Sequence, residues 1–372
     1  PDFLKSYNPR GVIKSSSDGK VQDSGPMTKK RMETIDDETT GAAIDYIKKQ
    51  ADAKKPFFVW MNFTRMHIFT HVRPEYRGKA GLGMGHEYAD GMWEMDQNVG
   101  KLLKTLEDAK ISDDTIVIFT TDNGPNFFTW PDAANTPFRS EKDSNWEGAF
   151  RVPAMVRWPG KIKPNTTSNG LISGLDWFPT LLAAAGDNNV KDRLLKGTGI
   201  GGKNFKLHLD GFNQLPMLTG QTEKSAREEY FYFNDDGELV ATRFDTVLPG
   251  ATNPTAFKVV FCEQRAPGGM QIWKEPFVCL RTPKFYNLRL DPYERGDIGP
   301  TNLYEQYQTE NAYVLFEATR RATNFLQTFV DYPPSQIAAS FTIDQVSADI
   351  KRKVQQQLAR QKQQAQQPQQ KK

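Results

Sequence analysis

The apolar positions in the first half of the chain follow two alternating patterns. Residues 57–63 and 115–121 are short apolar runs rich in β-branched and aromatic side chains, which is typical of strands buried on both faces. Residues 36–53 and 88–110 instead carry apolar side chains at helical spacing, which predicts two amphipathic helices. This succession of strands and helices predicts an α/β fold with a mostly parallel central sheet, in which the two strands are neighbours or near-neighbours.

The second half of the chain has a different pattern. Short apolar runs separated by turn signals such as Asp235-Asp236-Gly237 predict an antiparallel meander, followed by a long amphipathic helix over residues 302–329. The expected strands of the meander cover residues 230–233, 239–244, 257–261 and 285–290. We therefore expect three units, which are a larger α/β domain, an antiparallel subdomain that includes the long helix, and a Gln- and Lys-rich tail. Their bounds are residues 1–218, 219–350 and 351–372.

Composition excludes some classes of partner. The 372 residues include 48 Lys and Arg and 45 Asp and Glu, so the net charge of +3 gives no reason to expect a nucleic-acid partner. No apolar run approaches the length of a membrane span. Cys262 and Cys279 lie in apolar surroundings and are expected to be buried free thiols. The polar residues 1–35 are expected to form a surface loop, and the Gly- and Lys-rich residues 187–209 a surface excursion.

A candidate metal site follows the second predicted strand. The sequence Asp122-Asn123-Gly124-Pro125 places a carboxylate and an amide oxygen where a buried strand leaves the sheet. In open α/β sheets, ligands collect just outside the carboxyl ends of the strands, and oxygen ligands suit Ca²⁺ or Mg²⁺. Gly124 is expected to supply a turn conformation that few other residues adopt. The same four residues also form a common turn, so this pattern alone leaves a purely structural role open.

The residues after this turn make the pattern more specific. Lys142 is followed by Trp146-Glu147-Gly148, Arg151-Val152-Pro153 and Trp158-Pro159-Gly160. Together with residues 121–125, this succession resembles the type I arylsulfatases of the sulfatase family, within the alkaline-phosphatase-like superfamily. The resemblance implies an α/β/α sandwich with a smaller C-terminal antiparallel sheet and a long helix. It also implies hydrolysis of a sulfate monoester, and it suggests a periplasmic or secreted protein.

The resemblance assigns roles to individual residues. Asp122 and Asn123 are expected to ligate a divalent cation, usually Ca²⁺ with Mg²⁺ as the alternative, and Lys142 to bind the sulfate of a small-molecule ester. A Pro-Phe-Phe strand in this family delivers a histidine at its carboxyl end, and His67 matches that position. His67 is expected to donate a hydrogen bond to the sulfate or a proton to the leaving oxygen. His71 competes for the same role because a proline, Pro74, follows it.

One part of the family's active site does not occur in the sequence. The nucleophile of the family is a formylglycine made from a Cys or Ser in a Cys/Ser-x-Pro-x-Arg motif, and no such motif is present. We therefore expect an N-terminal portion to supply this group and the remaining metal ligands, and we expect the 372 residues to be inactive by themselves. Two alternatives stay open, namely a phosphomonoester or phosphonate hydrolase of the same superfamily and a non-catalytic protein that binds anions.

Overall fold

A computed structural model describes most of the chain. It covers residues 11–68, 71–127, 135–248, 250–299 and 302–334, together with Ile350, Val354 and Gln357. The predicted tail at residues 351–372 therefore lies outside the described residues, except for Val354 and Gln357.

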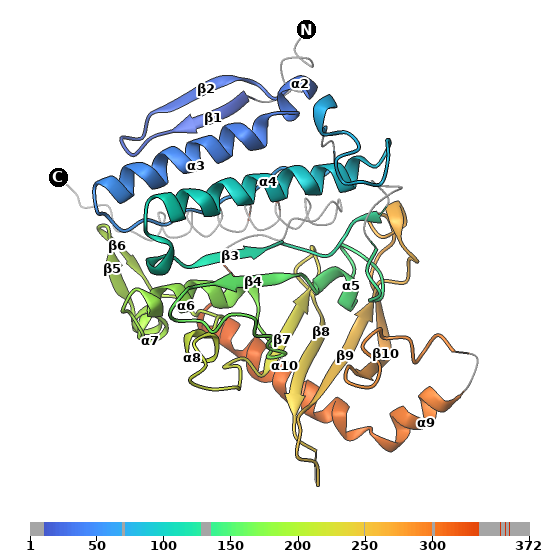
Figure 1. Ribbon diagram of the computed structural model, residues 1–372. Coiled ribbons are helices and arrows are strands. Elements are labelled where there is room, and N and C mark those ends of the chain that lie inside the picture. Colours follow the sequence, from blue (N-terminus) through green and yellow to red (C-terminus); the bar gives the residue numbers. More distant parts are fainter. Residues whose placement is uncertain are drawn as a thin grey trace, which may run out of the picture.

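The N-terminal layer consists of a hairpin and two long helices (Figure 1). Strands β1 (Gly11–Ser15) and β2 (Val21–Pro26) pair antiparallel, and the short helix α2 (Lys29–Met32) connects them to α3. The prediction of a surface loop over residues 1–35 is thus wrong for the described part, because a turn near Gly19 lets two polar strands pair. Helices α3 (Ile35–Asp52) and α4 (Glu87–Asp108) lie side by side, and both confirm the predicted helices.

The central strands differ from the prediction. Strand β3 (Val117–Thr120) pairs antiparallel with β4 (Ala154–Arg157). Residues 57–63 form no strand, although their exposure alternates as in a strand, with Phe58 at 69% and Trp60 at 81%. A strand needs a backbone partner, and no other described segment pairs with these residues. The expected strand at residues 57–63, a neighbour or near-neighbour of β3 in a mostly parallel sheet, is therefore not found, and every strand pair among the described residues is antiparallel.

The C-terminal meander is confirmed. Its strands are arranged in the order β10-β9-β8-β7 and all pair antiparallel. Their bounds are β7 Glu229–Phe233, β8 Leu239–Thr246, β9 Thr255–Glu263 and β10 Val278–Asn287.

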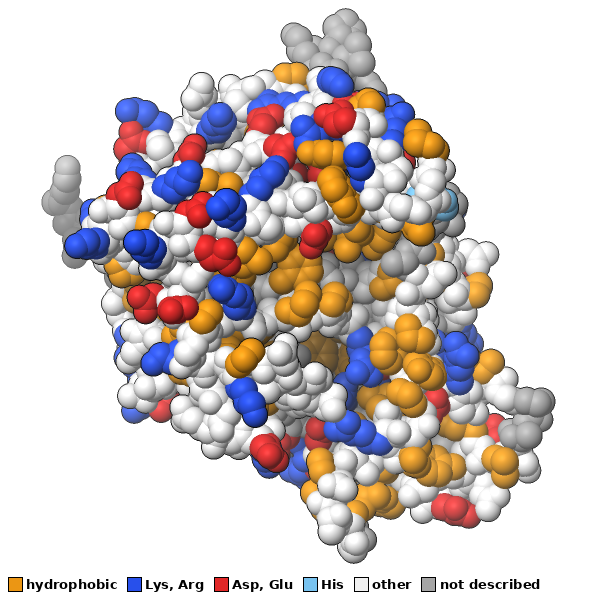
Figure 2. Space-filling view, viewed as in Figure 1, with side chains coloured by type: hydrophobic (Ala, Val, Ile, Leu, Met, Phe, Trp, Pro, Cys, Tyr) orange, Lys and Arg blue, Asp and Glu red, His pale blue; other side chains and the backbone are white. Residues whose placement is uncertain are grey.

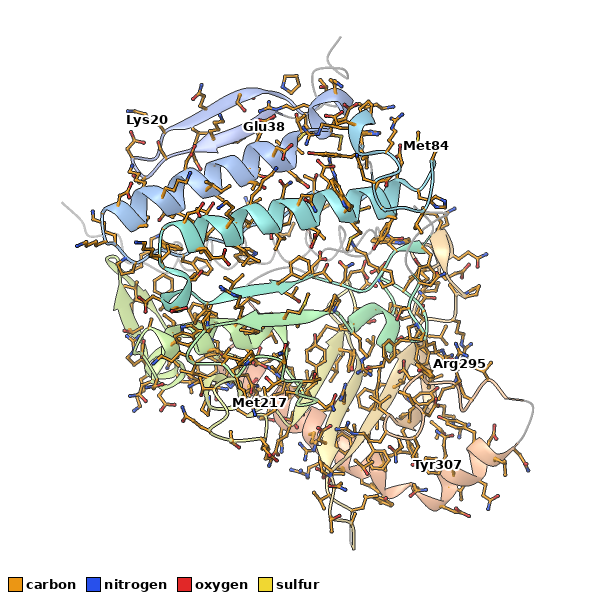
Figure 3. The ribbon with its side chains drawn as sticks, viewed as in Figure 1. Lys20, Glu38, Met84, Met217, Arg295 and Tyr307 are labelled. Atoms are coloured by element: carbon orange, nitrogen blue, oxygen red, sulfur yellow. A yellow bond between two sulfur atoms is a disulfide. The ribbon has the colours of Figure 1, made fainter. Side chains whose placement is uncertain are left out.

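The predicted long helix is divided into two. Helix α9 (Leu303–Glu310) ends at Asn311, and α10 (Tyr313–Asp331) follows at once. Buried Val314 and Ala318 of α10 pack against aromatic side chains of the sheet. Tyr307 extends from α9 toward the same sheet (Figure 3), where its ring centroid lies 5.8 Å from that of Phe285. The expected packing of a C-terminal helix on the small sheet is therefore confirmed.

The two cysteines form a disulfide, so the prediction of free thiols is wrong. Cys279 on β10 lies directly opposite Cys262 on β9, with their Cα atoms 3.8 Å apart. The spacing of 17 residues does not reveal this pairing, because the register of two strands is set by their pairing and not by their distance along the chain. The disulfide closes the loop between β9 and β10 at its base.

Smaller elements complete the described chain. Residues 187–209, expected as a surface excursion, contain a helix and a two-stranded hairpin. The remaining elements are η1 Pro74–Tyr76, η2 Ser112–Asp114, α5 Glu147–Phe150, η4 Gly174–Asp176, α6 Trp177–Ala184, α7 Val190–Lys196, β5 Thr198–Ile200, β6 Lys203–Phe205, α8 Leu215–Leu218 and η5 Gly269–Gln271.

No helix in the described ranges is both long and apolar enough to span a membrane. On the face shown in Figure 2, Lys and Arg alternate with Asp and Glu over the N-terminal layer, in keeping with the balanced charge.

Candidate active site

The Asp122-Asn123-Gly124 turn begins just beyond the end of β3. Asp122 is exposed, and one of its carboxylate oxygens accepts a hydrogen bond from the Thr121 hydroxyl at 3.2 Å. Asn123 is half-buried, and its Nδ2 donates to the Gly124 carbonyl at 2.8 Å. The amide oxygen of Asn123 points away from this bond, because the two polar atoms of a planar amide diverge. A carboxylate and an amide oxygen are therefore available at this edge of β3.

Gly124 is required for a reason other than the expected turn conformation. It is not among the residues with positive φ, and its N–H donates to the Ala149 carbonyl at 2.7 Å. A Cβ at Gly124 would lie 1.8 Å from the Gly148 carbonyl oxygen, and a Cβ at Gly148 would lie 2.2 Å from the Ser140 carbonyl oxygen. The predicted role of Gly124 in a turn conformation is thus wrong. Glycine is needed at this position because it lets two backbone segments approach each other closely.

Lys142 lies in a loop that is attached to this turn. Its backbone N–H donates to the Pro125 carbonyl at 2.9 Å, and Gly148 N–H donates to the Arg139 carbonyl at 2.8 Å. The structure therefore brings the loop of Lys142 and the loop of Asp122 together through the backbone. We call residues 139–149 the lysine loop.

Most of the lysine loop is buried, whereas Lys142 and Asp143 near its middle are half-buried. The exposed fraction is 1% for Glu141, 0% for Asn145 and 1% for Trp146. The Arg139 guanidinium stacks on Trp146, with its central carbon 3.5 Å from the ring centroid, and donates to the Glu294 carbonyl at 2.9 Å. The loop therefore presents Lys142 from a packed base.

A buried ion cluster lies beneath the lysine loop. Lys258 on β9 forms ion pairs with Glu147 at 3.2 Å and with Glu294 at 2.8 Å. The Tyr232 hydroxyl donates to Glu147 at 2.7 Å, and Glu147 N–H donates to Glu294 at 2.6 Å. Lys258, Glu147 and Glu294 are each at most 1% exposed, so the charges compensate one another away from water.

The pKa values of the two carboxyl groups in this cluster are shifted in opposite directions. Burial raises the pKa of Glu294 to about 7, and the neighbouring Glu147 charge adds to this effect while Lys258 opposes it. Burial also acts to raise the pKa of Glu147, but Lys258 and Arg243 outweigh it, so this pKa lies below its usual range. Glu147 is therefore the residue that holds the negative charge facing Lys258.

Acidic side chains lie near Lys142. Asp143 is half-buried and adopts a positive φ of 74°. Burial raises the pKa of Asp143 to about 6, and Asp235 and Asp236 in the β7–β8 turn add to this shift, while Lys142 opposes it. Lys142 thus supplies positive charge beside carboxylates that partly balance it.

The histidines lie on a different segment. His67 is exposed, and its Nδ1 lies 3.3 Å from the Ile68 carbonyl oxygen. The segment is anchored just before it, where Asp36 of α3 accepts from Thr64 N–H at 2.8 Å and Arg65 pairs with Glu94 of α4 at 2.9 Å. Arg65 also donates to the carbonyls of Met32 at 3.1 Å and Glu33 at 3.3 Å, so it anchors this segment on the N-terminal layer. Convergence of His67 with Lys142 stays a prediction.

His71 is half-buried and follows two residues that are not described. Its charge contributes to lowering the pKa of Glu33, although the hydrogen bond from Lys30 is the main cause. The choice between His67 and His71 therefore also stays a prediction. Among the described residues, no three His, Cys, Asp or Glu side chains gather as a possible metal site.

The residues that support this site were not predicted from the sequence. Glu147 stands in the motif Trp146-Glu147-Gly148, and Glu294 ends the run Asp291-Pro292-Tyr293-Glu294. Nothing in their spacing along the chain shows that they meet. Lys258 carried a weaker signal, since it is a lone charge within an apolar strand. A charge at such a position needs a buried partner.

Comparisons with known proteins agree with these motifs. The Sulfatase family model matches residues 2–187. The chain is 34% identical over 203 residues to N-acetylgalactosamine-6-sulfatase of Canis lupus familiaris, covering 54% of this chain and 35% of that protein. It is 29% identical over 262 residues to steryl-sulfatase of Mus musculus, covering 66% of this chain and 38% of that protein. The chain thus spans about a third of the length of these relatives.

A solved structure confirms the fold class. The crystal structure of PsFucS1 sulfatase from Pseudoalteromonas sp. matches with a TM-score of 0.74 and 26% identity, covering 90% of this chain and 61% of that one. The α/β architecture with a C-terminal antiparallel sheet is therefore shared with that enzyme.

Proposed function

Because the chain belongs to the sulfatase family, we propose that it carries the cation-binding and sulfate-binding loops of an enzyme that hydrolyses sulfate monoesters. The observation that carries this proposal is the junction of the two loops, in which Lys142 N–H donates to the Pro125 carbonyl at 2.9 Å. This junction holds the backbone of Lys142 next to the backbone of the Asp122 turn, which supports a shared site for the two loops. An anion that touches a bound cation and a lysine at the same time fits this arrangement.

The donor set fits a hard divalent cation. Asp122 and Asn123 would hold Ca²⁺, or Mg²⁺, through a carboxylate and an amide oxygen. The hydrogen bond from Asn123 Nδ2 to the Gly124 carbonyl orients the amide so that its oxygen is free for a cation. When bound, the cation supplies Lewis-acid polarisation of a sulfate oxygen.

The remaining residues would act on the sulfate itself. Lys142 would place a positive charge against a sulfate oxygen. His67, or alternatively His71, would donate a hydrogen bond to the sulfate or a proton to the leaving oxygen. The formylglycine nucleophile and further cation ligands would come from a portion of the protein outside these 372 residues.

We further propose an aryl-type sulfate ester as a substrate. Support for this proposal comes from the arylsulfatase-like motif around Lys142. The matched relatives are named as an N-acetylgalactosamine-6-sulfatase and a steryl-sulfatase, so a sugar sulfate and a steryl sulfate belong in the same assay panel.

The test uses the full-length protein and 4-nitrophenyl sulfate. Each of Asp122→Ala, Lys142→Ala and His67→Ala should lower kcat/KM by about two orders of magnitude or more. Asp122→Ala should also abolish Ca²⁺ binding in a calorimetric titration, which is independent of turnover. His71→Ala is the matched comparison for His67→Ala, and a crippled His71→Ala beside a silent His67→Ala would transfer the role to His71.

Two results would overturn the proposal. Wild-type turnover by Lys142→Ala or Asp122→Ala would remove these residues from the site. A higher kcat/KM for 4-nitrophenyl phosphate than for the sulfate would assign the protein to phosphomonoester hydrolysis. Replacement of exposed Lys224, which pairs with Glu228 on the surface, provides the control for a general effect of losing a lysine.

A further inference from the structure

The loop between β9 and β10 forms a second wall beside Lys142. We call residues 264–277 the β9–β10 loop; the disulfide between Cys262 and Cys279 closes it at the base. Figure 1 shows this loop at the upper ends of β9 and β10, next to α5. The sequence alone suggested no role for it.

The β9–β10 loop is bound to the lysine loop by side chains of the latter. Glu141 accepts from Gly269 N–H at 2.5 Å, and Trp146 Nε1 donates to the Gln264 carbonyl at 2.9 Å. Asn145 accepts from Gln264 N–H at 3.1 Å and donates to the Cys262 carbonyl at 2.8 Å. These side chains are buried, so water does not compete for the bonds. The two loops therefore hold a fixed position relative to each other.

Trp273 projects from a braced part of the β9–β10 loop. Gln264 Nε2 donates to the carbonyls of Ile272 at 3.2 Å and Glu275 at 2.8 Å, which lie on either side of Trp273. Ile272 is 3% exposed and fastens the loop to the core, whereas Trp273 is half-buried. The centre of its ring lies 6.0 Å from Lys142 Nζ. The half-buried indole ring, with the Lys142 ammonium over it, is thus held at a set distance from the candidate sulfate-binding lysine.

The size of a sulfate ester fits this distance. A lysine ammonium approaches a sulfate oxygen to about 2.8 Å, and the alcohol part of the ester begins within the next two bonds. When a sulfate ester is bound to Lys142 and directed toward Trp273, the distance from Nζ to the alcohol part is therefore similar to the 6.0 Å from Nζ to the centre of the indole ring. Indole rings stack well on aromatic rings and on apolar faces of comparable size.

Resting on the function proposed above, we propose that Trp273 is a specificity-determining residue that packs against the alcohol part of the sulfate ester. The ligand class is an alcohol with a flat apolar face, such as a phenol or the C–H face of a sugar ring.

The experiment separates binding of the sulfate from binding of the alcohol in the full-length enzyme. Trp273→Ala should raise KM for 4-nitrophenyl sulfate by about fivefold to tenfold and leave kcat within about twofold. The inhibition constant of inorganic sulfate, which has no alcohol part, should stay unchanged. Trp273→Phe should restore most of the affinity, because it keeps an aromatic face. Trp177→Phe on α6 is the matched tryptophan control.

A second variant guards against misfolding. Trp273→Leu keeps apolar bulk without the aromatic face, and it should show the same rise in KM with an unchanged thermal midpoint. Parallel assays with 4-nitrophenyl sulfate and N-acetylgalactosamine 6-sulfate decide between the two alcohol types, since the larger rise marks the face that Trp273 contacts.

The outcomes distinguish the two proposals. Unchanged KM values for both esters in Trp273→Ala and Trp273→Leu would overturn the role of Trp273 alone, as would an equal rise in KM and in the inhibition constant of sulfate. Lys142→Ala should weaken inhibition by inorganic sulfate. If that variant binds sulfate as the wild type does, the proposed function fails whatever Trp273 does.

Discussion

The lysine loop and the segment of residues 57–67 differ in how far the rest of the chain encloses them. The lysine loop follows a predicted strand and residues 57–67 include one, and both were expected to deliver a functional side chain to the same edge of the sheet. The lysine loop is enclosed, with residues 144–149 all buried and hydrogen bonds to the β9–β10 loop and to the ion cluster. Residues 57–63 are open, with Phe58 and Trp60 largely exposed, and His67 is exposed as well.

This difference shows where the positioning of each side chain comes from. Partners within the described chain settle the position of Lys142. The buried Arg65, with its bonds to Asp36 and Glu94, anchors the start of the histidine segment. Four measurements can break or sharpen this contrast.

The largest effect is expected from the ion cluster. Lys258→Met removes the cation that pairs with both buried Glu147 and buried Glu294, and breaking a buried pair in this way typically costs about 3–5 kcal/mol of stability. Urea unfolding of the 372-residue chain measures this loss. Lys224→Met, which breaks an exposed pair with Glu228, should change stability by less than about 1 kcal/mol. Equal losses in the two variants would contradict an enclosed lysine loop.

The next effect concerns the close approach of two backbones. Gly124→Ala would place a Cβ 1.8 Å from the Gly148 carbonyl oxygen, and overpacking of this kind costs about 1–3 kcal/mol. Gly100→Ala, on the exposed side of α4 with no atom within 4 Å of the added Cβ, should instead stabilise the chain by about 0.5–1 kcal/mol. Thermal unfolding of both variants gives the signs. A stabilising Gly124→Ala would show that the junction of the loops is loose.

A smaller effect should appear as a dependence on pH. The folded-state pKa of Asp143 is raised to about 6, so the folded state binds this proton more tightly than the unfolded state does. Its contribution to stability is therefore fully present below the unfolded pKa of about 3.9 and is lost as pH rises through about 6. Glu294, with its pKa raised to about 7, acts in the same direction.

The contribution of Asp143 is isolated by substitution. Asp143→Asn should flatten the fall in unfolding free energy between pH 4 and pH 6, as followed by urea midpoints across that range. Asp45→Asn, which alters an exposed carboxylate on α3, should leave the slope unchanged. An unaltered slope in Asp143→Asn would mean that water reaches this carboxyl group as freely as it reaches Asp45.

The smallest effect is expected in the open segment. Trp60 is 81% exposed, so Trp60→Ser should change the stability of the 372-residue chain by less than about 0.5 kcal/mol. Trp146→Phe removes a buried indole and its hydrogen bond to the Gln264 carbonyl, and should cost more. A large loss in Trp60→Ser would show that another part of the chain covers this segment in solution.

The sequence predicted those features that depend on local patterns. Helices α3 and α4, the four-stranded meander and the turn after β3 follow from apolar spacing and turn residues, and all are present. Residues 57–63 have the alternation of a strand, but a strand also needs a partner, which a local pattern does not supply. The break between α9 and α10 was missed because Asn311 and Ala312 interrupt the apolar spacing only slightly.

The candidate site was predictable in part for the same reason. Asp122, Asn123 and Lys142 stand in motifs, and a backbone hydrogen bond joins their loops, while their roles stay predictions. The residues that hold the loops, such as Lys258 and the disulfide pair, meet only through strand register, which depends on the whole sheet. Gly124 was recognised as important for the wrong reason, because its close neighbour Gly148 is 24 residues away in the sequence.

The cluster beneath the lysine loop also has a consequence for the timing of synthesis. Glu294 lies 147 residues after Glu147, and Lys258 lies 111 residues after it. At about 5–20 residues per second, a ribosome needs on the order of ten seconds to complete that distance. During this interval Glu147 of the nascent lysine loop has neither Lys258 nor Glu294 beside it. The base of the candidate sulfate-binding site thus forms late, after β9 with Lys258 and the turn after β10 with Glu294 have been synthesised. A chaperone that shields residues 139–149 would have to remain bound until then.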